Sequence, residues 1–108
     1  MKHTHDEVKN RFNFIPTSLD GLYKIERKLI EDSRGFLSRI FCSVDFQQIG
    51  FTKPIVQMNH TLTYNQGVIR GMHYQKYPHK EAKILTCIHG EIFDVVVDIR
   101  KNSPTFLK

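Results

Sequence analysis

Turn signals divide the chain into many short apolar stretches, and this spacing constrains the fold more than any other feature. Asp32-Ser33-Arg34-Gly35, Asn65-Gln66-Gly67 and His89-Gly90 are turn sequences, because Gly, Asn, Asp and Ser favour tight-turn conformations. Short apolar stretches bounded by such turns are typical of strands in sandwiches and barrels. We therefore expect strands at residues 22–31, 36–41, 55–64, 68–75, 82–88 and 91–99.

The remaining segments complete an all-β domain with one short helix. Ser43 is a candidate cap for a helix at residues 44–49, which Gly50 would end. Residues 1–17 lack periodicity and are expected to form an N-terminal tail or arm. With 108 residues in all, the chain has room for one domain, expected at residues 18–108.

The charge balance favours a small anionic ligand over a nucleic acid. The net charge is +5, from 16 basic and 11 acidic residues. The basic residues are dispersed and form no nucleic-acid-binding motif, whereas a nucleotide diphosphate would account for the excess. No apolar run approaches the roughly 20 residues that span a bilayer, and the N-terminus is polar. We expect a cytoplasmic protein without nucleic-acid or membrane partners.

Three basic side chains within fourteen residues form the candidate site: Arg70, His73 and Lys83. Arg70 and His73 are three residues apart and would lie on opposite faces of a regular strand. Gly71 between them permits a bulge that would turn both toward one cavity. Lys83 lies in an apolar stretch, where a charged side chain is unusual unless it has a specific role. From the chemistry alone, an ordinary surface strand with solvated charges is an equal alternative.

Several motifs resemble the dTDP-4-dehydrorhamnose 3,5-epimerase family in order and spacing, from about residue 18 onward. The most specific is the segment Val68-Ile69-Arg70-Gly71-Met72-His73-Tyr74-Gln75. The others are Arg34-Gly35-Phe36, Gln57-Met58-Asn59-His60, Ala82-Lys83, the segment from Gly90 to Arg100, and Ser103-Pro104-Thr105-Phe106.

The resemblance implies a fold and a role for each matching residue. The fold would be a double-stranded β-helix, the cupin jelly roll, associated as a homodimer. His73 would be the base that removes the protons at C3 and C5 of the sugar, on either side of the C4 ketone. Lys83 would stabilise the enolate oxygen. Arg34 and Arg70 would contact the nucleotide diphosphate, and Gln57 and Asn59 would hydrogen-bond the sugar nucleotide.

The chain also departs from the family pattern. Leu37 and Arg39 stand where the family has a second aromatic residue and a glutamate. The match covers roughly the first three-fifths of the family pattern, so the jelly roll is expected to be incomplete at the C-terminus. The family's catalytic tyrosine and the aspartate that orients the histidine would lie beyond it.

No metal or other cofactor is expected. Many cupins bind metal through a motif that spans the equivalent of Gly67 to Gly90. Here Gln75 replaces its second histidine and Lys83 its glutamate. A lysine cation is a poor metal ligand and would repel a metal ion.

The function expected from the resemblance is epimerisation of a dTDP-4-keto-6-deoxyhexose at C3 and C5, in the biosynthesis of dTDP-rhamnose or a related deoxysugar. A ketoisomerase or a single-site epimerase acting on a related nucleotide sugar is a close variant. The alternative is that the protein is not an enzyme. It would then be a truncated half-cupin that binds nucleotide sugar weakly, pairs with another chain or serves only as a structural module.

Overall fold

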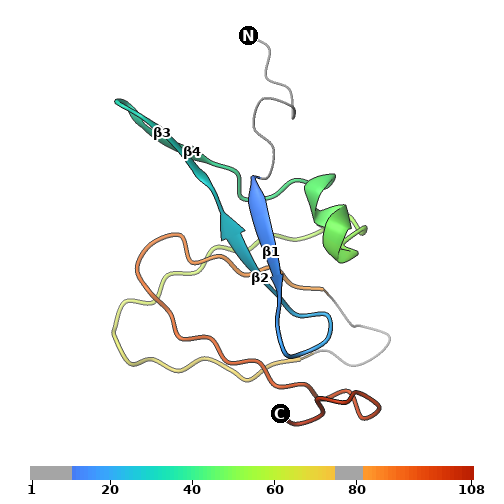
Figure 1. Ribbon diagram of the computed structural model, residues 1–108. Helices are drawn as coiled ribbons and strands as arrows, with labels where there is room; N and C mark the ends of the chain where they lie inside the picture. The colour runs from blue at the N-terminus through green and yellow to red at the C-terminus, as the bar shows by residue number, and fades with distance from the viewer. Residues whose placement is uncertain (1–10, 75–81) are drawn as a thin grey trace. The chain divides into compact units, whose positions relative to one another are not determined.

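The computed structural model describes residues 11–74 and 82–108 and is shown in Figure 1. Its regular elements form two antiparallel two-stranded sheets and one short 3₁₀ helix. In chain order they are β1 (Phe12–Pro16), β2 (Tyr23–Arg27), β3 (Leu29–Asp32), β4 (Gly35–Ser38) and η1 (Asp45–Ile49). The chain divides into two compact units, residues 1–52 with 86–108, and residues 53–85. The predominance of strands agrees with the all-β prediction.

Strand β1 lies in the segment that was expected to be a tail or arm. It pairs antiparallel with β2, from Phe12 opposite Arg27 to Pro16 opposite Tyr23. The turn between the two strands is closed by Thr17, whose amide donates to the carbonyl of Leu22 at 3.1 Å and whose hydroxyl donates to the same carbonyl at 2.9 Å. The alternation of Phe12, Asn13 and Phe14 is a strand pattern, and it was overlooked because the stretch is short.

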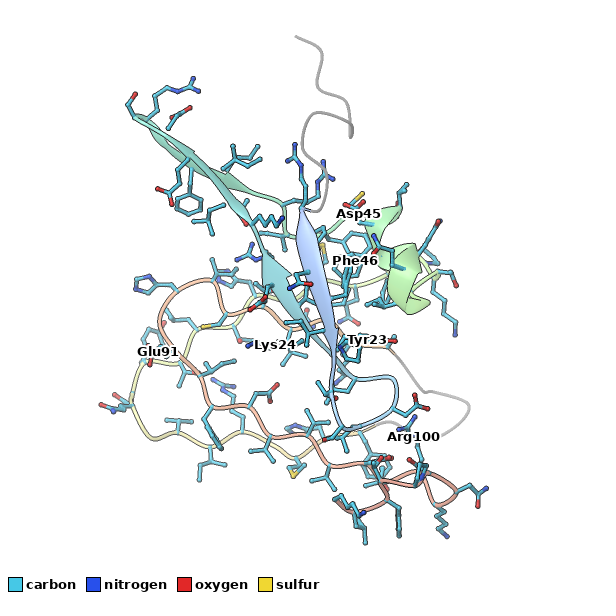
Figure 2. The ribbon with its side chains drawn as sticks, viewed as in Figure 1. Tyr23, Lys24, Asp45, Phe46, Glu91 and Arg100 are labelled. Atoms are coloured by element: carbon cyan, nitrogen blue, oxygen red, sulfur yellow. The ribbon has the colours of Figure 1, made fainter. Side chains whose placement is uncertain are left out.

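An aromatic cluster forms the core of the unit that contains β1. Phe46 of η1 and Phe12 of β1 are buried, and Phe46 extends from the helix toward β1 (Figure 2). The Phe46 ring meets those of Phe12 and Phe14 edge to face, with centroids 5.1 and 5.2 Å away. Phe41 and Phe51 complete the cluster. Each such pair contributes about 0.5–1.5 kcal/mol beyond the burial of its area.

The predicted short helix is present, but its cap and type differ from the prediction. It ends at Gly50, whose φ of 78° is in the left-handed region that glycine favours, as predicted. The helix is 3₁₀, it is preceded by Val44, and no side chain caps it, so the Ser43 cap is wrong. The carbonyl of Cys42 accepts the Phe46 amide at 3.0 Å instead, so the backbone itself provides this partner.

The predicted strand at residues 22–31 is divided in two, because the chain changes partners. The Lys28 amide donates to the Arg11 carbonyl at 3.1 Å, at the end of the β1–β2 ladder. The chain then continues as β3 and pairs with β4, from Leu29 opposite Ser38 to Asp32 opposite Gly35. The predicted turn at residues 32–35 is confirmed. β4 is shorter than the predicted strand at residues 36–41.

The other predicted strands are not formed. In the described residues 53–74 and 82–100 no strand is present, which corrects the predictions for residues 55–64, 68–74, 82–88 and 91–99; Gln75 lies outside the described residues. Large apolar side chains there are exposed, with Ile69 at 92% and Phe93 at 94%. Apolar patterns specify which side chains favour a sheet face, but a strand also requires a hydrogen-bonded partner.

None of the helical structure in the described residues has the length and apolar character that a membrane span requires.

Candidate functional site

Arg34 occupies the turn between β3 and β4, where Asp32 fixes both its backbone and its side chain. The Asp32 carboxylate accepts from the Arg34 amide at 2.8 Å. It also accepts from Nε at 3.3 Å and from Nη2 at 2.6 Å. These hydrogen bonds from Arg34 lower the pKa of the Asp32 carboxyl. Arg34 and Leu37, one of the two departures from the family pattern, line the same shallow concavity on this hairpin.

Arg70 is held by a neutral partner on the other side of a turn. Its Nε donates to the hydroxyl oxygen of Thr63 at 3.2 Å. Thr63 stands three residues before Gln66 and Arg70 three residues after Gly67, and the chain reverses between them. Gly67 has a φ of 85°, a conformation that non-glycine residues rarely adopt. The predicted turn at residues 65–67 is therefore confirmed, although the strands on either side of it are not.

The other predicted site residues are exposed and lie outside regular secondary structure. Gln57, Asn59, His73 and Lys83 are all exposed. Gly71 has a φ of 113°, so the backbone between Arg70 and His73 departs from a regular strand, as the glycine suggested. Five of the six predicted residues belong to the unit at residues 53–85, and Arg34 belongs to the other unit. Their convergence on one cavity stays a prediction.

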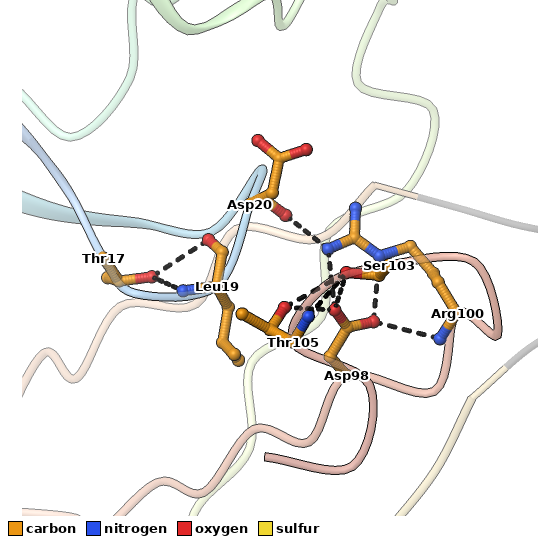
Figure 3. Close-up of polar contacts among 7 residues, drawn as sticks. All are labelled: Thr17, Leu19, Asp20, Asp98, Arg100, Ser103 and Thr105. Carbon is orange, nitrogen blue, oxygen red and sulfur yellow. Dashed lines mark hydrogen bonds and ion pairs between the residues drawn. The ribbon is translucent and has the colours of Figure 1, made fainter.

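Sequence reasoning missed a polar cluster centred on Asp98, which Figure 3 shows. The Asp98 side chain is 2% exposed and its carboxylate accepts from Nε of Arg100 at 2.9 Å and from Nη2 at 3.0 Å. The hydroxyls of Ser103 and Thr105 donate to the same carboxylate at 2.5 and 2.6 Å. The available signal was an aspartate directly after the run Val95-Val96-Val97, since a buried carboxylate requires donors nearby.

The Asp98 cluster connects segments that are far apart in sequence. Arg100 donates through Nη2 to the carbonyl of Asp20 at 2.7 Å, in the loop between β1 and β2. The amide of Leu107 donates to the Asp98 carbonyl at 2.7 Å. The hydrogen bonds from Arg100, and then those from Ser103 and Thr105, hold the pKa of Asp98 far below its ordinary value. The carboxylate is thus charged at neutral pH and organises the loop at residues 98–107.

In the part of the chain that the structure describes, no group of three His, Cys, Asp or Glu side chains lies close enough to hold a metal ion.

Comparisons with known proteins converge on one family. The family model of dTDP-4-dehydrorhamnose 3,5-epimerase matches residues 16–108. Proteins named dTDP-4-dehydrorhamnose 3,5-epimerase are similar to this chain in Shigella flexneri (42% identity over 89% of this chain and 53% of the relative) and Methanothermobacter thermautotrophicus (43% over 88% and 50%). The protein of that name in Escherichia coli K12 is 37% identical over 89% of this chain and 52% of its own length.

These matches cover most of this chain but a smaller share of each relative. The chain spans about half the length of the curated relatives it matches. No solved structure matches it. Because the family model covers all but the first fifteen residues, the chain belongs to the dTDP-4-dehydrorhamnose 3,5-epimerase family.

Proposed function

We propose that this protein acts on a dTDP-4-keto-6-deoxyhexose and epimerises it at C3 and C5, in the formation of dTDP-rhamnose or a related deoxysugar. The observation that carries the proposal is the family match over residues 16–108. The relatives that match most of this chain are named for this epimerisation. The proposal includes a jelly-roll domain from residue 18 onward, a homodimer and a cytoplasmic location.

His73 and Lys83 carry the chemistry in this proposal. The protons at C3 and C5 are acidic because the C4 ketone can accept the electron pair left behind. His73 removes such a proton, since imidazole is the side chain most often used as a general base in enzymes. The electron pair moves to the ketone oxygen, and the Lys83 ammonium stabilises the resulting enolate. Inversion then requires a general acid that delivers a proton to the opposite face of the carbon, the role that the resemblance gives to the family's tyrosine.

The remaining predicted residues hold the substrate. Arg34 and Arg70 contact the diphosphate, for which the planar guanidinium is suited because it can bind two phosphate oxygens at once. The present partners of the two arginines differ in charge. Asp32 binds Arg34 through Nε and Nη2, and Thr63 binds Arg70 through Nε alone. Gln57 and Asn59 supply amide hydrogen bonds to the sugar nucleotide.

Exchange of the C3 and C5 protons tests this function. The chain is incubated with dTDP-4-keto-6-deoxyglucose in deuterated water, and NMR follows the loss of both proton signals. We expect His73→Ala to slow the exchange by about 10²–10⁴-fold and Lys83→Ala by about 10²–10³-fold. His89→Ala is the matched control, because His89 lies outside the predicted site. Equal rates for the wild type and His73→Ala would exclude His73 as the base.

The same experiment separates the alternatives. A half-cupin that only binds nucleotide sugar would bind dTDP without catalysing exchange at either carbon. A single-site epimerase would exchange the proton of one carbon only. A ketoisomerase would move the carbonyl, which changes the carbon chemical shifts of the sugar. The exposure of the candidate residues at positions 53–74, where no strand is formed, is the observation that keeps the binding-only alternative in the test.

A further inference from the structure

We infer that Thr63 is a positioning residue that holds the Arg70 guanidinium in the orientation needed to bind a diphosphate. The inference rests on the proposed function, because it takes Arg70 as an anion contact. It adds a residue that has no assigned role. The geometry that carries it is the hydrogen bond from Arg70 Nε to the Thr63 hydroxyl oxygen, 3.2 Å long.

The atoms used in this contact leave the ligand-binding end of the guanidinium available. A guanidinium has five N–H donors, one on Nε and two on each terminal nitrogen. Thr63 takes the Nε donor. The two terminal nitrogens form one of the edges through which a guanidinium can bind two phosphate oxygens side by side. A partner at Nε therefore fixes the plane of the group without occupying the edge that meets the anion.

Threonine is suited to this task because its side chain is stiff and neutral. Branching at Cβ restricts χ1, so the hydroxyl oxygen is held in place by the residue's own geometry. An arginine on an exposed surface otherwise loses much rotamer freedom when it binds a ligand. A hydroxyl bears no charge, so it orients Arg70 without repelling an anion, unlike the carboxylate of Asp32 beside Arg34.

The turn between the two residues makes the contact local. Thr63 and Arg70 are seven residues apart, and the reversal between them contains Gly67 with its φ of 85°. The contact lies within the unit at residues 53–85. Its formation depends on this turn.

The test is a double-mutant cycle with thymidine diphosphate as the probe, measured by isothermal titration calorimetry. Thr63→Val removes the hydroxyl and keeps the shape, Thr63→Ser keeps the hydroxyl, and Arg70→Ala removes the guanidinium. We expect Thr63→Val to weaken binding by about three- to tenfold, the usual effect of one hydrogen bond, and Thr63→Ser to restore most of the affinity. In the Arg70→Ala background, Thr63→Val should have no further effect. Thr61→Val is the matched control.

The possible failures are distinguishable. If Arg70→Ala weakens binding while Thr63→Val leaves it unchanged, the positioning role is overturned and the anion contact stands. If the wild type does not bind the probe, or Arg70→Ala has no effect, the diphosphate role of Arg70 fails and the inference fails with it. The Nε–H resonance of Arg70 gives a readout without ligand. A resonance that Thr63→Val leaves unmoved would also overturn the inference, because it would show that the hydrogen bond is absent.

Discussion

Two Asp-x-Arg sequences in this chain form the same local hydrogen bonds in different surroundings. In Asp32-Ser33-Arg34 and in Asp98-Ile99-Arg100, the aspartate accepts from the arginine amide, from its Nε and from its Nη2. At the first sequence the Asp32 and Arg34 side chains are 51% and 88% exposed. At the second, Asp98 is 2% exposed and Arg100 is 54% exposed.

The difference between the two pairs comes from the residues around them. Asp98 also receives the hydroxyls of Ser103 and Thr105, and Arg100 also reaches the Asp20 carbonyl. The second Asp-x-Arg sequence therefore also connects segments that are far apart in the sequence. An exposed ion pair contributes little to stability because water and salt screen it, whereas removing one member of a buried network leaves the others without partners. The second pair is therefore suited to hold the fold, whereas the first pair lies in solvent.

Replacing Asp98 should have the largest effect on stability. Asp98→Asn keeps the size of the side chain but removes its charge and one of the two oxygens that accept from Arg100, Ser103 and Thr105. We expect it to lower the urea midpoint of unfolding roughly three times as much as Asp32→Asn does, since only the Asp98 carboxylate is buried and shared by several donors. Urea denaturation followed by circular dichroism measures both. Equal shifts would mean that burial does not distinguish the two pairs.

The contribution of Asp98 to stability should depend on pH, because its pKa differs between the folded and unfolded states. The folded state holds this pKa below its unfolded value, so the carboxylate stabilises the fold above about pH 4, the ordinary aspartate pKa. This stabilisation decreases as the pH falls from there toward the depressed folded pKa. As the pH is lowered from about 5 to about 3, we expect the urea midpoint of the wild type to fall. The urea midpoint of Asp98→Asn should fall less over the same range. Parallel pH profiles for the two proteins would contradict the assignment.

Replacing each of the two arginines by alanine should separate the effect on ligand binding from the effect on stability. We expect Arg34→Ala to weaken thymidine diphosphate binding by roughly tenfold, the effect of one charge-assisted hydrogen bond, with little change in the unfolding midpoint. Arg100→Ala should lower the midpoint and leave the affinity of the folded protein unchanged. Calorimetry and urea denaturation on both variants measure the two quantities. Equal destabilisation by Arg34→Ala and Arg100→Ala would contradict the proposed difference between the two pairs.

The smallest effect is expected from the exposed carboxylate. Asp32→Asn should change the unfolding midpoint only slightly, because the Arg34–Asp32 pair lies in solvent. Raising the salt concentration to about 0.5 M should remove the remaining difference from the wild type, since the Debye length there is only several ångströms. Thermal unfolding of both proteins at low and high salt measures this. A difference that persists in salt would indicate a structural role for the Asp32 turn.

Local features of the fold were predictable because they depend on neighbouring residues. The turn at residues 32–35 follows from Asp32 and Gly35, and the reversal at residues 65–67 from Gly67. The end of η1 at Gly50 follows from glycine's tolerance of positive φ. The family was recognisable from motifs in its order and spacing, above all the segment from Val68 to Gln75. The Phe12 strand was missed although its alternation was readable.

The sequence by itself determined the family, because its motifs occur in the family's order and spacing along the chain. It also determined the turns, because these depend on residue types within a few positions of one another. Only the tertiary structure decided that Asp98 gathers Arg100, Ser103 and Thr105 while Asp32 stays exposed. It also decided that Phe46 packs against Phe12 and that the apolar segments at residues 53–74 and 82–100 form no strand in the described chain. The physical reason is that burial and strand pairing depend on partners from elsewhere in the chain, which a local pattern does not specify.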